Sequence, residues 1–222
     1  MIQHDYLLRL IEEFTRALSR IQELRTGDRP ADADQALDHQ FQLLVQSDRA
    51  SLLRLSVTEI LARIVRQGAS HEVHARTFFL VALFRESGAL AEEQGDIDLA
   101  RENHLQALRL LFACFQHLDP AETPRFVPTV DGLLSLLPAQ SLSADLHAAA
   151  MHHFERLGRF ADAENSLFHL LDQAAGTAGL REFGTAFYQR LESLNDATLE
   201  RGRLGRAELA EGLQAFQKRA NV

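Results

Sequence analysis

Two stretches of the chain share one spacing of glycine, alanine and apolar residues. In both, a glycine is followed five positions later by an alanine and twelve positions later by an apolar pair. The residues are Gly95, Ala100 and Ala107-Leu108 in the first stretch, and Gly158, Ala163 and Leu170-Leu171 in the second. A glycine between two helical patterns ends the first helix and lets the chain turn back. Each stretch therefore predicts a pair of antiparallel helices.

The first stretch gives the clearest reading. Gly88 and Ala91 put small groups one turn apart on one helix face, so a second helix can approach closely. Gly95 accepts the left-handed conformation that a helix end needs. Asp96 is placed to cap the following helix, because its carboxylate can accept from the free amides of the first turn. We expect a tight helix pair here.

The second stretch is a looser copy. Met151 stands where the first has its small glycine, and Leu170 replaces an alanine. We expect this pair to pack at a wider spacing. Between the copies lie about twenty-nine residues more than a strict period of roughly thirty-four allows. The insert at 118–142 predicts one extra helix, capped by Thr123, with Pro124 in its first position and Pro138 after its end.

The repeated spacing resembles that of tetratricopeptide repeats. This resemblance implies an all-α, right-handed stack of helical hairpins, an α-α superhelix. No period-two alternation suggests a sheet. We expect an N-terminal helical subdomain at 1–69 packed on repeats at 70–222, which include a C-terminal capping pair, in one continuous domain.

The N-terminal segment carries a narrow apolar seam at four-three spacing. Its residues are Leu7, Ile11, Phe14, Leu18 and Ile21. Such a seam either packs within its own chain or forms a homodimer contact. It is shorter than the three to four heptads typical of a coiled coil, which favours packing within the chain. Further on, Ser56 and Glu59 form a capping box for a short helix.

Charge and cysteine content exclude several classes of protein. The net charge is −8 and no basic cluster exceeds a pair, so nucleic-acid binding is not expected. The single cysteine, Cys114, excludes an internal disulfide and a multi-thiolate metal site. Neither a signal peptide nor a membrane span is recognisable at the N-terminus. We expect a cytoplasmic protein without a cofactor.

A helical stack of this kind displays a surface, so the predicted function is a non-enzymatic scaffold that binds a protein or peptide segment in a groove. The candidate groove residues are Arg85, Glu92, Glu93, His152, Glu155 and Arg156. Repeat proteins that grip an acidic peptide end carry Lys, Asn and Arg on these faces. Only Arg85 matches that character, so a mixed or basic ligand is expected.

Histidines support an alternative, an enclosed metal or small-molecule site with a possible enzymatic role. His71 and His74 lie one helical turn apart and can reach one metal ion. Their spacing is one residue too short for a zinc-protease helix. His147 and His152-His153 lie together on another expected helix, although adjacent side chains point about a hundred degrees apart.

Four short patterns are distributed along the whole chain. They are Asp5-Tyr6 with Arg9 and Ile11, the run Leu52-Leu53-Arg54-Leu55-Ser56, the turn Gly95-Asp96, and Glu211-Gly212-Leu213. With these patterns the chain resembles a bacterial family of tetratricopeptide-like proteins of unknown function. The resemblance implies no activity.

Overall fold

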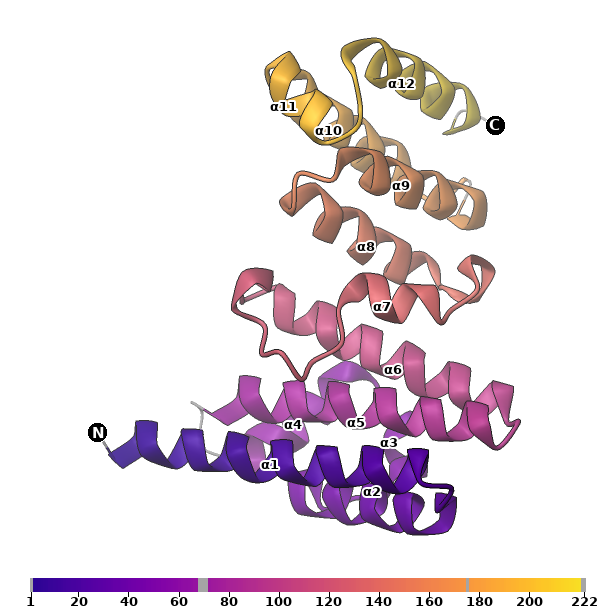
Figure 1. Cartoon of the computed structure of the whole chain (residues 1–222). Helices are drawn as coiled ribbons and strands as arrows, with labels where there is room; N and C mark the ends of the chain where they lie inside the picture. Colours follow the sequence, from indigo (N-terminus) through magenta and orange to yellow (C-terminus); the bar gives the residue numbers. More distant parts are fainter. Residues whose placement is uncertain (1, 68–71, 175, 221–222) are drawn as a thin grey trace. The chain divides into compact units, whose positions relative to one another are not determined.

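The computed structural model describes residues 2–67, 72–174 and 176–220, and every regular element in these ranges is a helix (Figure 1). This confirms the all-α prediction for the described residues. The chain divides into two compact units, residues 1–138 and 139–222. The predicted domain boundary near residue 69, and the prediction of one continuous domain, stay predictions.

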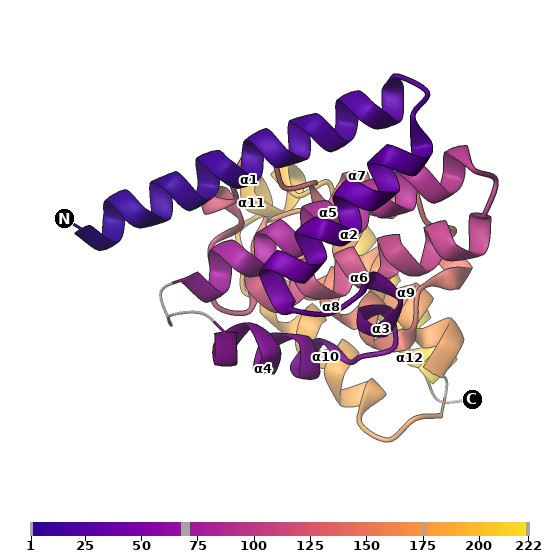
Figure 2. The same ribbon diagram turned by 90° about the horizontal axis from the view of Figure 1, so that it is seen from below.

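The first unit is built from seven α-helices among its described residues. They are α1 (Ile2–Thr26), α2 (Pro30–Val45), α3 (Arg49–Leu53), α4 (Val57–Gln67), α5 (Val73–Glu93), α6 (Ile97–Phe115) and α7 (Val130–Ser135), with a 3₁₀ turn, η2, at Pro120–Glu122. Helices α1 and α2 form one pair, and the buried helix α5 packs on α1, α2, α4 and α6 (Figure 2).

The second unit is smaller. Its elements are the 3₁₀ turn η3 (Ala139–Ser141), α8 (Ala144–Arg156), α9 (Phe160–Ala174), α10 (Leu180–Glu192), α11 (Asp196–Arg201) and α12 (Arg206–Ala220). Helices α8 and α9 pack on each other along their lengths, and α12 covers α9 and α10. The polar face of α12 remains exposed, while Leu209 and Phe216 are buried beneath it.

The hairpin α5–α6 has the features that its sequence predicts. Gly95 adopts the left-handed conformation with φ +79°, and the Asp96 side chain accepts from the amide of Leu99 at 3.1 Å. Gly88 allows the close approach. A Cβ atom at this position would lie 2.2 Å from Cε1 of His104, whose ring fills the space on α6. Helices α5 and α6 therefore pack closely against each other at Gly88.

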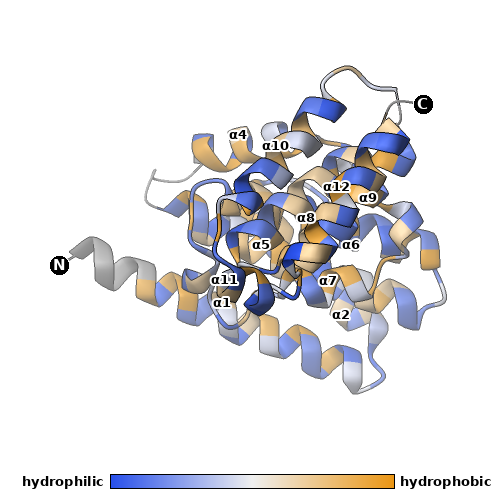
Figure 3. Ribbon diagram, turned by 90° about the horizontal axis from the view of Figure 1, so that it is seen from above, coloured by the Kyte–Doolittle hydropathy of each residue, from blue (hydrophilic) through white to orange (hydrophobic). Residues whose placement is uncertain are grey.

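The N-terminal seam packs within its own unit. Phe14 stacks on Phe79 of α5 with ring centroids 4.0 Å apart, and Leu18 and Ile21 are also buried. Hydrophobic and hydrophilic residues alternate along the α1 ribbon, as an amphipathic helix requires (Figure 3). Dimerisation stays a prediction, and a dimer contact through these three side chains would have to displace α1 from α5. The side chain of Leu7 lies outside the described residues.

The insert contains one α-helix, as predicted, but that helix begins later than expected and has a different cap. Thr123 does not cap a helix; it closes the 3₁₀ turn at Pro120–Glu122, which Asp119 caps. The one α-helix of the insert is α7, whose cap is Thr129, with its hydroxyl 3.0 Å from the amide of Gly132. The start of this helix was predicted wrongly because one Asp-Pro pair, one Thr-Pro pair and one Pro-Thr pair in the insert offer competing start signals. The capping box of α4 is confirmed, with Ser56 and Glu59 bonded reciprocally.

Candidate functional site

A pocket of about 480 Å³ opens in the first unit beside α5. Residues from three segments line it: Gln22 of α1; Ala82, Arg85 and Glu86 of α5; and Arg125 to Thr129, Gly132, Leu133, Ser135 and Leu136 of the insert. The insert therefore lies over the face of α5 on which the sequence analysis placed its candidate groove. What remains at this position is a partly open pocket with the volume of a small-molecule site.

The wall of this pocket contains a buried carboxylate. Glu86 is 2% exposed and stands in the middle of the buried stretch of α5. Its Oε1 accepts a hydrogen bond from Nε2 of Gln22 at 2.9 Å and another from Nη1 of Arg85 at 2.6 Å. Its Oε2 lies 3.3 Å from Nε of Arg25, which also pairs with Glu93.

This arrangement explains how a charge is tolerated inside the unit. A buried carboxylate is costly unless hydrogen bonds and opposite charges compensate it. Glu86 has both, because two arginines and one amide surround it. In return the carboxylate fixes Arg85, whose side chain is 37% exposed and whose other guanidinium nitrogens have no partner among the described residues.

The insert is anchored by Phe126. Its ring lies 5.5 Å from the rings of both Phe14 and Phe79. These aromatic contacts hold the insert against α1 and α5, so the pocket has an apolar floor on one side. The neighbouring Arg125 is exposed at the rim, and among the described residues it has neither a hydrogen bond nor an ion pair.

The three predicted groove residues of α5 are all engaged within the unit. Arg85 and Glu93 belong to the network around Glu86. Glu92 instead lies 3.3 Å from Nε2 of the buried His104. Burial lowers the pKa of His104, and the charge of Glu92 only partly opposes this effect. Arg85 alone of the three reaches the pocket.

The predicted groove residues of α8 lie in the second unit. Glu155 forms a bidentate ion pair with Arg190 of α10, at 2.6 and 2.8 Å. Partial burial raises the pKa of Glu155, but the hydrogen bonds from Arg190 and His152 outweigh it and bring the pKa to about 2. The exposed His152 also packs edge-on against Phe183, with ring centroids 5.2 Å apart. Arg156 is exposed.

The histidines predicted as alternative ligands are dispersed. His71 lies outside the described residues, and His74 is exposed. His147 is buried and stacks on His169 at 5.2 Å, and burial, followed by the proximity of His169, lowers its pKa. Among the described residues no three His, Cys, Asp or Glu side chains gather where a metal ion could be held. A metal site involving His71 stays a prediction.

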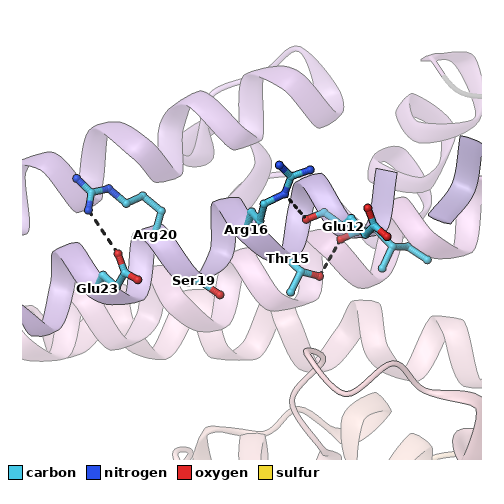
Figure 4. A pocket seen from close by; sticks show the side chains of 7 residues that line it. Glu12, Thr15, Arg16, Ser19, Arg20 and Glu23 are labelled. Carbon is cyan, nitrogen blue, oxygen red and sulfur yellow. Dashed lines mark hydrogen bonds and ion pairs between the residues drawn. The ribbon is translucent and has the colours of Figure 1, made fainter. Parts of the chain in front are cut away.

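Cys114 and a depression along α1 are not candidates for a functional site. Burial raises the pKa of the Cys114 thiol to about 12, which makes it a packing residue rather than a nucleophile. A shallow depression along α1 is lined by residues of that helix alone, and the side chains of Thr15, Arg16 and Arg20 form hydrogen bonds within the helix (Figure 4). In the described part of the chain, no helix combines the length and apolar character needed to cross a membrane.

One family model, described as a family of unknown function (DUF6483), matches residues 1–221. The chain belongs to this family. The family is defined without an activity, so it confirms the resemblance to an uncharacterised family and assigns no role to the pocket. No curated protein and no solved structure matches the chain significantly.

The sequence analysis missed Gln22, Arg25, Glu86 and Arg125. One signal was present: a glutamate at position 86 interrupts the apolar run from Thr77 to Ala91. A charge in such a run needs compensating partners. Those partners could not be named from the sequence, because Gln22 lies 64 positions away on another helix.

Proposed function

We propose that this chain is a non-enzymatic, tetratricopeptide-like interaction module of the bacterial cytoplasm. Its hairpins stack as a right-handed superhelix, and a protein or peptide segment binds to the exposed residues of their first helices. The family itself has no stated function, so the proposal rests on how the two hairpins are built.

The observation that carries the proposal is the equivalence of the two hairpin turns. In each, three successive amides donate to the last turn of the first helix, at 2.9 to 3.2 Å. The pairs are Gln94 to Leu90, Gly95 to Glu92 and Asp96 to Ala91 in one, and Leu157 to His153, Gly158 to Glu155 and Arg159 to Phe154 in the other. Both glycines have positive φ, and the alanine five positions on is buried in both.

Repetition of one hairpin design supports display rather than catalysis. Repeated helix pairs produce extended surfaces whose exposed positions vary while their buried positions stay apolar. Here the exposed positions on the first helices include Glu92, Glu93, His152 and Arg156. Their charges are mixed, which suits a partner segment that also carries both signs or a basic excess.

The experiment is affinity capture from a lysate of the source organism. The wild type is compared with Arg85→Glu and with Arg156→Glu, one variant in each unit. Arg101→Glu on α6 and Arg181→Glu on α10 are the matched controls. They make the same charge change on helices that are not part of the proposed binding surface. Circular dichroism checks that each variant is folded.

We expect one protein to be retained by the wild type and by both controls, and to be lost or reduced with Arg85→Glu, Arg156→Glu or both. Retention by all five proteins would place the binding surface elsewhere. Absence of any retained protein would contradict an interaction role.

A further inference from the structure

We infer that the pocket beside α5 binds a small organic anion, a carboxylate or a phosphate monoester on an apolar body. This inference concerns a ligand rather than a protein partner, and it does not depend on the proposed interaction surface. Three features of the pocket support this ligand: the charges that line it, its unpaired hydrogen-bond donors, and the apolar residues around them.

The charge balance of the pocket is positive. Three charged residues line it, namely Arg85, Arg125 and Glu86. The carboxylate of Glu86 is already matched by Arg85 on one oxygen and by Arg25 beside the other. No negative charge therefore remains to attract a cation, whereas one arginine charge is unmatched. The pocket therefore carries a local excess of positive charge, although the net charge of the chain is −8.

The open hydrogen-bond capacity consists of donors. Nη1 of Arg85 donates to Glu86, and the other nitrogens of its planar guanidinium have no partner among the described residues. Arg125 has all its donors available within the described residues. The hydroxyl of Thr129 accepts from Gly132, so its own hydrogen remains for a ligand. Two arginine forks and a hydroxyl match the oxygens of a carboxylate or phosphate.

Most of the remaining lining residues are apolar, and Gln22 and Ser135 are the polar exceptions. Ala82, Phe126, Val127, Pro128, Leu133 and Leu136 contribute to the pocket wall. A volume of about 480 Å³ lies within the usual range for small-molecule sites. The anionic group therefore lies between the arginines, and an apolar portion of the ligand packs against the insert. Glu86 acts as a positioning residue, because its carboxylate accepts a hydrogen bond from Nη1 of Arg85.

The test measures binding of three small probes to the full chain by isothermal titration calorimetry. Phenylacetate and phenyl phosphate carry the two anionic groups, and phenylacetamide has the shape of the first without its charge. We expect both or one of the anions to bind and phenylacetamide to bind at least about tenfold more weakly. Tighter binding of phenylacetate assigns a carboxylate ligand, and tighter binding of phenyl phosphate assigns a phosphate monoester.

The decisive variant is Arg125→Gln, because Arg125 makes no described contact whose loss would unfold the unit. It is expected to weaken anion binding by about tenfold, whereas Arg125→Lys keeps most of the affinity. Arg54→Gln, which changes another exposed arginine of the same unit, leaves binding unchanged. Equal affinity for phenylacetamide, wild-type affinity in Arg125→Gln, or no binding of either anion at millimolar concentration overturns the inference.

Discussion

The hairpins α5–α6 and α8–α9 share a turn but not an interior. At the turn, glycine conformation and hydrogen bonds coincide residue for residue. In the interior, Gly88 of the first hairpin receives the His104 ring, whereas the corresponding Met151 of the second is itself a fully buried filler. The turn follows from backbone requirements that few residues meet. The interior follows from how side-chain volumes are divided between the two helices, and many divisions are possible.

The surroundings of the two hairpins differ as well. Helix α5 contacts α1, and the insert lies beside it, with a polar network and a partly open pocket between them. Helix α8 is linked to α10 through the Glu155–Arg190 ion pair, which is partly exposed. The same hairpin design is therefore combined with a pocket in one unit and with a partly exposed ion pair in the other.

The largest loss of stability is expected from truncating Met151, the buried side chain in the interior of the second hairpin. Met151→Ala leaves a cavity at a position that is 0% exposed, and should lower the free energy of unfolding by about 3 kcal/mol. Urea unfolding followed by circular dichroism measures it, since the chain has no Trp for fluorescence. A loss below about 1 kcal/mol would show that the interior of α8–α9 is loosely packed.

The next largest loss of stability is expected from adding a side chain at Gly88, the corresponding position of the first hairpin. Gly88→Ala places a Cβ 2.2 Å from the His104 ring, and should cost about 2 kcal/mol even though alanine favours the helix by about 1 kcal/mol. The His104→Ala background is the control. In that background Gly88→Ala should be neutral or stabilising. An unchanged loss of stability would show that the His104 ring is not the cause.

The two turns should respond alike to the same change. Gly95→Ala and Gly158→Ala each put a Cβ on a left-handed residue, with φ +79° and +69°, and neither Cβ meets another atom within 4 Å. Backbone strain alone should cost about 1 kcal/mol in each case. Thermal and urea unfolding compare them. Costs that differ by more than about 1 kcal/mol would break the equivalence of the turns.

The ion pair of the second unit should have the smallest effect. Arg190→Gln should lower stability at neutral pH by about 0.5 kcal/mol, because the pair is partly exposed. The pKa of Glu155 is lowered from 4.5 to about 2, so its contribution is present above pH 4.5 and is lost as the pH falls toward 2. The difference between variant and wild type should vanish over that range. Arg101→Gln, at an exposed pair on α6, should show no comparable pH dependence.

The sequence predicted the local parts of this structure better than the long-range parts. Gly95 with Asp96, and Ser56 with Glu59, act within a few residues of each other, so their spacing was sufficient. The network around Glu86 joins residues from α1 and α5, and the covering of α5 depends on Phe126. Such contacts are fixed by tertiary packing, which one sequence does not display. Six groove positions were named, yet only Arg85 lines the pocket.

The central claim is that exposed residues of α5 and α8, such as Glu92 and His152, bind a partner, and photo-crosslinking in the source cell tests it most directly. A benzophenone amino acid at Glu92 or His152, both partly or largely exposed, is compared with the same group at Arg101 on α6 or Asn165 on α9. The account predicts one protein crosslinked from Glu92, from His152 or from both, and absent from the two control positions. Equal crosslinking from all four positions, or none from Glu92 and His152, would contradict it.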